Sequence, residues 1–458
     1  MKAFVGVQVG AISFVDEGVD ATLDRLQRVA RATAICVSAL SWSRGNAGRA
    51  TTGFPDHGVA EPDELQGGAF FKYNHRYYEA TSLKHFGAPD PIYREFDTLG
   101  DVIPAAAKRG MKVYPYYCET AHSNIRPRWQ PGFVQVMELD AFGRRTGRPC
   151  MRNPDYRAWW AAVIDNWLSE YELAGVMWGI ERETPLSSLL ASDAATCFCR
   201  YCRDEAHRRN VDAERAAEGY RVLTAYFAAA RRGERPADGY FVEFLRTLSR
   251  YPEIAQWETF WLDGHKSQYR DIAGQVKFHG PEYEVGLGIW QMIDTFSPWL
   301  KAQHEPGELR GYADWIKPVL YNIPAGERFQ KYLNGLCNTV LRDATPTEWA
   351  PILCKVLGLN EAGFEELGRA GFSARYVEEQ TRRYVTAVEG QAAVYPGLGV
   401  GVERVERPVG ATDVLEMVSA AAAGGATGIM LSRNYSEMDT GTLEAVGAAV
   451  DAVWGSTE

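Results

Sequence analysis

The chain has 458 residues, of which 46% are hydrophobic and 24% are charged, and its formal net charge at pH 7 is −10. This composition is typical of a folded globular protein, and the chain is much longer than one small core requires. The negative charge disfavours nucleic acid and anionic membrane surfaces as partners, because proteins that track phosphates carry an excess of basic residues.

The chain begins MKAFVGVQVG, so that a strand pattern follows Met1 directly. A secretory signal would place a basic segment, an apolar run and a cleavage site first, so we expect a cytoplasmic protein. The longest weakly charged stretch, residues 414–431, contains Glu416 and a Gly-Gly pair that divide it into helix, turn and strand. The sequence therefore predicts no transmembrane segment.

Eight short apolar runs, rich in β-branched and aromatic residues, alternate with helical patterns as in parallel βα units. In chain order the runs cover residues 3–14, 32–42, 111–119, 175–181, 283–291, 314–322, 393–402 and 428–434. Helical spacing occurs at residues 20–32, 97–110, 155–171 and 411–425. We therefore expect a single α/β domain over residues 1–458, folded as a (β/α)8 TIM barrel.

Three connections are longer than plain loops of a barrel: residues 43–96, 182–282 and 323–392, which follow the second, fourth and sixth runs. Loops that follow strands lie at the catalytic face of a barrel. We expect these segments to be helical insertions, or lids, over an active site.

The motif CFCRYC places Cys197, Cys199 and Cys202 within six residues. Such a C-x-C-x-x-C array can bring three thiolates to one Zn²⁺, with a fourth ligand from elsewhere. Cys150, Cys118 and His207 are the candidates for that ligand. Because protein groups would fill all four positions, the zinc would be structural; the alternative is reduced thiols at the start of a helix.

A further pattern surrounds this motif. In chain order it comprises Cys150, Asn153, Pro154, Tyr156, Arg157, a strand that ends at Glu181, and then Cys197, Cys199 and Cys202. This order resembles the zinc-bearing β-galactosidases of glycoside hydrolase family 42. The resemblance implies that Cys150 is the fourth zinc ligand and that Glu181 is a general acid, although Ile180 stands where that family has Asn. The segments MWGIERETP, KPVLYNIPAGER and LSRNYSEM more closely resemble an uncharacterised group of bacterial glycosyl-hydrolase-like proteins.

Glycoside hydrolysis requires two carboxyl groups, one protonated as acid and one ionised as nucleophile or base. Glu181 suits the acid, because it ends a strand behind the apolar pair Met177-Trp178, which would desolvate it. For the second group we favour Glu403, after the seventh run, narrowly over Glu437, after the eighth. Each of them could instead be a solvated loop acid.

Other strand ends carry side chains suited to a sugar. Trp42, Trp178 and Trp290 would offer apolar faces for stacking. Donors and acceptors for hydroxyl groups would come from Glu119, His122, Gln291, Tyr321, Asn322 and Arg433. Asp294 is a third option for the second carboxylate. Arg182 would orient substrate oxygens or pair with Glu183, which we expect to be more solvated than Glu181.

These patterns predict a glycosidase that acts on a small oligosaccharide or glycoside, without an organic cofactor. GLGVGVER, although rich in glycine, is neither a P-loop nor a dinucleotide-binding motif. One alternative is a metal-dependent sugar isomerase or epimerase that uses Glu119, His122, Glu181 and Asp294. Another is a non-catalytic sugar-binding barrel. The sequence is also compatible with a homo-oligomer.

Overall fold

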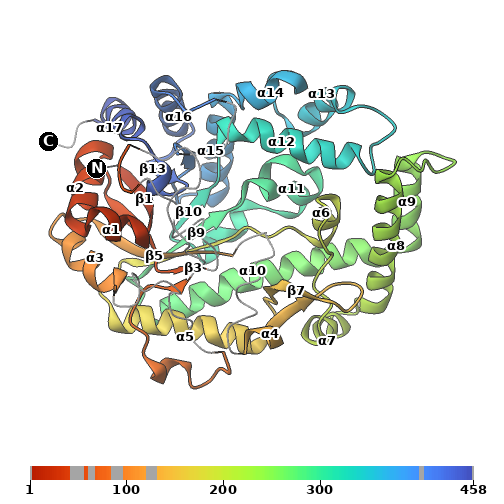
Figure 1. The fold of residues 1–458 in the computed structure, drawn as a ribbon, viewed down its shortest axis with the longest axis horizontal. Coiled ribbons are helices and arrows are strands. Elements are labelled where there is room, and N and C mark those ends of the chain that lie inside the picture. Colours follow the sequence, from red (N-terminus) through yellow and green to blue (C-terminus); the bar gives the residue numbers. More distant parts are fainter. Residues whose placement is uncertain are drawn as a thin grey trace.

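The computed structural model describes residues 3–41, 56–59, 68–83, 96–119, 132–401 and 407–455. Its central feature is a nine-stranded sheet in the order β11-β10-β9-β8-β5-β2-β1-β13-β12, and every pairing in it is parallel. The strands are β1 (Phe4–Gly10), β2 (Ala34–Ser38), β5 (Lys112–Glu119), β8 (Gly175–Ile180), β9 (Glu284–Ile289), β10 (Trp315–Pro318), β11 (Ala393–Val394), β12 (Gly397–Gly399) and β13 (Gly428–Ser432). Helices surround these strands (Figure 1).

Strands β11 and β12 are two halves of the seventh strand position, separated by Tyr395 and Pro396. The first half pairs with β10 and the second half with β13. A parallel bridge between Val319 and Gly397, with the Leu320 amide donating to the Gly397 carbonyl at 2.9 Å, joins the end of β10 to β12. The sheet thus has eight positions arranged as a ring, which confirms the predicted α/β (β/α)8 fold.

Each of the four predicted helices is present, as α2 (Val19–Ala30), α3 (Thr98–Ala107), α5 (Pro154–Glu170) and α16 (Ala411–Ala423). Local sequence explains their starts. At α5, for example, the Asn153 side chain accepts a hydrogen bond from the Asp155 amide at 3.0 Å, and Pro154 occupies the first turn.

The long connection after β8 contains α6 (Pro185–Leu190), α7 (Arg200–Arg208), α8 (Ala213–Arg231), α9 (Tyr240–Arg250) and α10 (Glu253–His279). The connection after β10 contains α12 (Asn322–Cys337), α13 (Pro346–Leu357), α14 (Phe364–Ala370) and α15 (Ala374–Val388). α10 packs against α5, β8 and β9, so it belongs to the barrel wall, whereas α8 and α9 lie at one edge of the molecule (Figure 1, right). Among the helices of the described ranges, none is long and apolar enough to cross a membrane.

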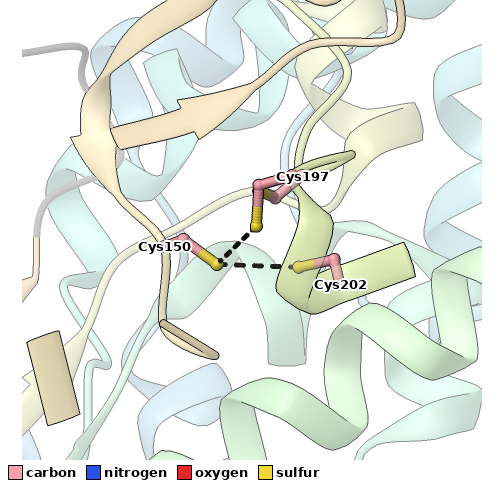
Figure 2. A group of neighbouring side chains, drawn as sticks. Cys150, Cys197 and Cys202 are labelled. Carbon is pink, nitrogen blue, oxygen red and sulfur yellow. Dashed lines mark hydrogen bonds between the residues drawn. The ribbon is translucent and has the colours of Figure 1, made fainter. Parts of the chain in front are cut away.

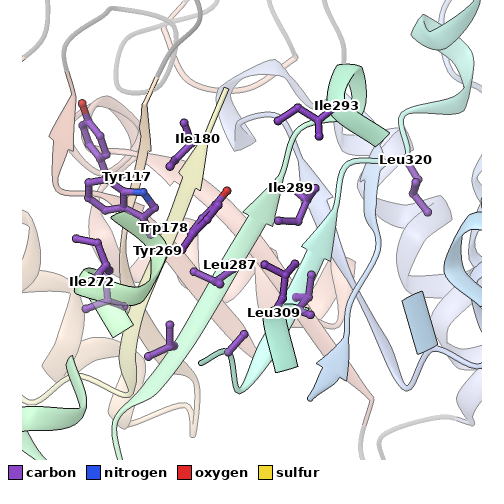
Figure 3. Close-up of a cluster of buried hydrophobic side chains, with 14 of the residues drawn as sticks. Tyr117, Trp178, Ile180, Tyr269, Ile272, Leu287, Ile289, Ile293, Leu309 and Leu320 are labelled. Atoms are coloured by element: carbon purple, nitrogen blue, oxygen red, sulfur yellow. The ribbon is translucent and has the colours of Figure 1, made fainter. Parts of the chain in front are cut away.

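The outer faces of β8 and β9 are covered by α10. Trp178 and Ile180 from β8 and Leu287 from β9 are buried together with Tyr269 and other residues of α10 (Figure 3). Side chains in a strand alternate between its two faces. Those of Val176, Trp178 and Ile180 therefore point outward, and the intervening positions point into the barrel.

Aromatic rings fill the amino-terminal end of the barrel interior. The rings of Phe4 and Tyr395 are stacked with their centroids 4.0 Å apart, and the ring of Tyr114 lies 5.5 Å from that of Trp315. Gly286 leaves room for the Trp315 indole, since a Cβ at Gly286 would lie 2.1 Å from that ring. At its amino-terminal edge this layer ends in a polar contact, because the Tyr114 hydroxyl donates to Glu284 at 2.7 Å. Toward the carboxyl-terminal end of the strands, Lys317 donates to Gln8 inside the barrel.

Candidate active site

Glu181 follows β8 directly and continues its alternation. Met177 lies in the interior cluster with Tyr116 and Cys118, while Trp178 and Ile180 face the helices. The Glu181 amide donates to the Glu119 carbonyl of β5 at 2.5 Å, so the ladder extends to this residue. Its side chain is therefore on the inner side of the barrel, at the carboxyl end of the fourth strand position.

The surroundings of Glu181 are mostly apolar or cationic. Burial raises the pKa of Tyr116 and of Cys118 well above their ordinary values, and the negative charge of Glu181 adds to both shifts. Burial lowers the pKa of Arg328, and the charge of Glu181 opposes that shift. Within the described part of the chain, the Glu181 carboxylate itself has neither a hydrogen-bond nor an ion-pair partner.

Arg182 points to the opposite side of the strand end and is 1% exposed. Its guanidinium lies 2.6 Å from Glu119 and 3.3 Å from Glu138, and it donates to the Pro149 carbonyl at 2.7 Å. Burial lowers the pKa of Arg182, but the charges of Glu119 and Glu138 outweigh it, and the pKa lies above its ordinary value. Arg182 thus pairs with these carboxylates rather than with Glu183, and Glu119, which also accepts from the Tyr156 hydroxyl, is part of a buried network.

Glu183 differs from the sequence-based expectation of a solvated side chain. It is partly buried, and this burial raises its pKa to about 7, while Arg148 lowers the pKa and Asp193 raises it. Glu183 is therefore a carboxyl group near the end of β8 with a pKa raised by burial toward neutral pH. Its position two residues after Glu181 was the only signal for it in the sequence.

The other predicted carboxylates have cationic neighbours. Asp294 is 3% exposed and pairs with Arg383, and His304 Nδ1 lies 3.6 Å away. Burial raises the pKa of Asp294, but His304 and Arg383 lower it further, and the pKa lies below its ordinary value. Glu437 lies 3.1 Å from Arg433, and its Oε2 accepts from the Asn434 amide at 3.1 Å. Glu403, together with Trp42 and His122, lies outside the described residues.

Gln291 and Tyr321 are brought together with Arg328. The Gln291 amide donates to the Tyr321 carbonyl at 3.3 Å, and its oxygen accepts from Arg328 at 2.9 Å. The Arg328 guanidinium also lies 5.1 Å from the centroid of the Tyr321 ring. Arg328, which the sequence analysis missed, lies two turns into α12 and links Tyr321 to the surroundings of Glu181.

The remaining predicted sugar-binding residues contact the core of the protein. Trp178 is 0% exposed, with its ring centroid 5.0 Å from Tyr117 and 4.1 Å from Trp160, so its faces are covered by the core. The Asn322 amide donates to the Phe372 carbonyl at 3.1 Å. Trp290 is only partly buried and packs at the edge of the core.

Lys317, a second residue that the sequence analysis missed, points into the barrel from β10. It is 3% exposed, and its Nζ donates to Gln8 Oε1 on β1 at 2.8 Å. The Ser432 hydroxyl of β13 donates to the same oxygen at 2.8 Å. A charged residue within the apolar run DWIKPVLYN, with the same parity as Trp315, was the signal that could have found it.

Four cysteines converge beside the Arg182 network. Cys150 follows β7 (Arg145–Pro149), while Cys197, Cys199 and Cys202 lie before and within the first turn of α7. All four are buried and their sulfur atoms lie within 4.8 Å of one another; the Sγ of Cys150 is 3.5 Å from that of Cys199 and 3.6 Å from that of Cys202. Figure 2 shows the side chains of Cys150, Cys197 and Cys202 turned toward one another.

This donor set fits a metal ion. Tetrahedral zinc with four thiolates separates the sulfur atoms by about 3.8 Å, because each Zn–S bond is about 2.3 Å long. The fourth position of the cluster is filled by Cys150, as the resemblance implied. Cys118, the other cysteine candidate, lies in the barrel interior with Tyr116 and Met177. The four sulfur atoms could therefore hold one metal ion.

Comparison with known proteins gave three instructive solved structures, although no family model and no curated protein matches the sequence. They are β-galactosidases from the haloarchaeon Halorubrum lacusprofundi (TM-score 0.53, 14% identity), from Marinomonas ef1 (0.53, 10%) and from Rahnella sp. R3 (0.50, 14%). The alignments cover 97%, 99% and 99% of this chain, but only 57%, 59% and 55% of those chains. At such identities the likeness shows a common fold, the (β/α)8 barrel.

Proposed function

We propose that the protein is a glycoside hydrolase that cleaves the O-glycosidic bond of a small oligosaccharide or glycoside, with Glu181 as general acid and base. One observation carries the proposal: a partly buried carboxylate at the end of the fourth strand, on the inner side of the barrel, without a pairing cation in the described part of the chain. The carboxyl ends of barrel strands are where catalytic residues of such folds lie, and no ion pair among the described residues occupies this carboxylate. The β-galactosidases that have the same fold support this choice of reaction class.

In the proposed reaction, the Glu181 proton passes to the leaving oxygen as the bond between the anomeric carbon and that oxygen breaks. As that bond breaks, a second carboxylate acts in one of two ways. It bonds to the anomeric carbon, and a water that gives its proton to Glu181 then breaks this new bond and releases the sugar, or it takes the proton from a water that attacks the anomeric carbon directly. For this role we retain Glu403 first and Glu437 second. Tyr321 and Gln291, held by Arg328, would contact the sugar hydroxyl groups.

The positions of Glu119 and Asp294 do not favour the alternative of a metal-dependent isomerase. It requires Glu119, Glu181 and Asp294 to share one divalent ion. Glu119 instead pairs with Arg182, and Asp294 pairs with Arg383.

Turnover of a panel of 4-nitrophenyl glycosides by Glu181→Gln tests the assignment. Because glutamine keeps the shape and removes the exchangeable proton, we expect kcat/KM to fall at least ~100-fold. Glu183→Gln is the matched control and should retain most of the activity. Both variants should keep the wild-type circular dichroism spectrum and melting temperature.

Two results would contradict the proposal. A Glu181→Gln enzyme that turns over its substrate at the wild-type rate would remove Glu181 from the chemistry. Loss of activity in Glu183→Gln alone would move the acid role to Glu183, whose pKa of about 7 also suits an acid.

We also propose that the four-cysteine cluster holds a structural Zn²⁺, which would supply no chemistry because all four ligands come from the protein. The cluster adjoins the Arg182 network at two points. The Pro149 carbonyl, which precedes Cys150, accepts from Arg182, and the Thr196 hydroxyl, which precedes Cys197, donates to Glu138 at 2.7 Å. The cluster would therefore hold the segments that position Arg182 and, with it, the backbone of Glu181.

A further inference from the structure

Two cations lie at one aromatic ring near the proposed acid. Lys317 Nζ is 5.9 Å and the Arg328 guanidinium carbon 5.1 Å from the centroid of the Tyr321 ring. Lys317 is 3% exposed, and Arg328 is partly buried. Both side chains thus bring positive charge to the inner, carboxyl-terminal part of the barrel.

Neither cation has a carboxylate partner within the part of the chain that the structure describes. Lys317 donates to the neutral amide of Gln8, and Arg328 donates to the neutral amide of Gln291. By contrast, the buried Arg182 has two carboxylates. A buried charge is costly unless it is paired, so two inward-facing cations without a carboxylate partner among the described residues favour the binding of an anion from outside the chain.

The charges of Lys317 and Glu181 act on a common neighbour. The Lys317 charge lowers the pKa of Cys118 and the Glu181 charge raises it, although burial is the larger cause of the shift. Burial lowers the pKa of Arg328, and the charge of Glu181 raises it. The two cations and the carboxylate therefore lie around one region of the interior.

Glycine lines the wall between them. Lys317 pairs with Gly288 in the neighbouring strand, and Gly288 pairs with Gly179 of β8, two residues before Glu181. A Cβ at Gly179 or at Gly288 would meet no heavy atom closer than 3.5 Å. The direct path along the wall from Glu181 to Lys317 is therefore bare backbone.

We infer that the substrate carries an anionic group, a carboxylate or a phosphate, which binds to Lys317 and Arg328 while the glycosidic oxygen faces Glu181. This inference rests on the proposed function for the reaction class and adds the charge of the substrate. The substrate class is then an acidic glycoside, such as a uronide or a sugar phosphate, rather than a neutral galactoside.

Thermal unfolding of the full chain at constant ionic strength tests the inference. The probes are galacturonate, glucuronate, galactose 6-phosphate and glucose 6-phosphate, each beside neutral galactose or glucose. We expect at least one acidic probe to raise the melting temperature and, in calorimetric titration, to bind at least ~10-fold more tightly than its neutral counterpart. The carboxylate and phosphate probes distinguish the two kinds of anion.

Variants assign the effect to the two cations. Lys317→Met and Arg328→Met should each remove the preference for the acidic probe, and Lys317→Arg should retain part of it. Lys355→Met, which removes an exposed lysine from α13, is the matched control and should bind like the wild type. If Lys317→Met does not fold, the binding preference of Arg328→Met tests the inference.

The inference is overturned if no acidic probe binds more tightly than its neutral counterpart, or if Lys317→Met and Arg328→Met keep the preference. The two proposals can fail separately. Charge-dependent binding without turnover of any acidic glycoside would contradict the glycosidase and leave the anion site in place. Turnover of neutral glycosides without a preference for acidic ones would contradict the anion site and leave the glycosidase in place.

Discussion

Arg182 shows how one side chain fixes the position of its neighbour. Glu181 and Arg182 are consecutive and point to opposite sides of the strand end, one into the barrel and one into a buried ion-pair network. Rotating Arg182 away would leave Glu119 buried without this cation and would leave Glu138 with Arg148 alone, at 3.5 Å. The network therefore restricts the backbone from which Glu181 projects.

Replacing Arg182 by Met tests this role. The variant should lose roughly 3–5 kcal/mol of unfolding free energy, because buried Glu119 loses its ion-pair partner and buried Glu138 keeps only Arg148. Burial already raises the pKa of Glu138, and Arg182 lowers it, so the variant should raise that pKa further. A carboxyl pKa that is higher in the folded state costs stability as the pH rises above its unfolded value. The deficit should therefore be smallest near pH 5 and larger at pH 8.

Urea unfolding at both pH values measures this difference. Arg232→Met is the control, because that arginine is 63% exposed and should change the stability by less than ~0.5 kcal/mol. An Arg182→Met deficit as small as that of the control, or one that shrinks as the pH rises, would contradict the proposed role of the ion pairs.

Alternation along the strands explains which residue predictions could be made. The inward position of Glu181 follows from a period of two that begins at Gly175, and the same period turns Trp178 outward into the core. Parity alone could therefore have removed Trp178 from the sugar-binding candidates. The partner of Arg182 was not predictable, because Glu138 lies on a separate hairpin formed by β6 (Met137–Leu139) and β7.

At the scale of elements, glycines in β9 and α10 have opposite roles. Gly286 faces the Trp315 indole in the barrel interior, whereas a Cβ at Gly274, on an exposed position of α10, would meet no atom within 4 Å. Gly286→Ala should cost roughly 1–3 kcal/mol because the interior would be overpacked. Gly274→Ala should stabilise the protein by up to about 1 kcal/mol through helix propensity.

Thermal unfolding of the two single variants checks this contrast. Both replace glycine by alanine, so the change in the unfolded chain is the same and the difference reports the folded environment. If both substitutions changed the unfolding free energy equally, the Trp315 indole would have moved aside without destabilising the protein, which would contradict the prediction.

Patterning predicted the elements but not every boundary. All eight runs became strand positions, since each combines apolar residues with flanking turn signals. The division of the seventh position into β11 and β12 was not predicted, although Pro396 lies within the run and lacks the N–H that a continuous ladder needs. The ends of helices α6 to α9 were not predicted, because no strand separates these helices in the sequence.

At the scale of the whole molecule, the cysteine cluster joins the end of β7 to the start of α7. We expect the purified protein to contain about one zinc per chain by mass spectrometry. Cys150→Ser should reduce the metal content and lower the melting temperature, because metal binding adds to folding free energy. Cys354→Ser, outside the cluster, should retain the metal.

A Cys150→Ser variant with full zinc content would contradict the assignment. The grouping of Cys197, Cys199 and Cys202 could be predicted from the sequence because the three residues are close together in the chain. The convergence of Cys150, about fifty residues earlier, could be predicted only by resemblance, since it depends on how the β6–β7 hairpin folds back on α7.

The buried network around Arg182 links the folding stability of the protein to the proposed chemistry. Residue 182 contributes to folding through Glu119 and Glu138, and it is joined by one peptide bond to the proposed acid. Natural selection that maintains either property would thus maintain the other. Under the proposed function, a descendant without the reaction would still need Arg182 for folding, and a descendant with the reaction would need it for both.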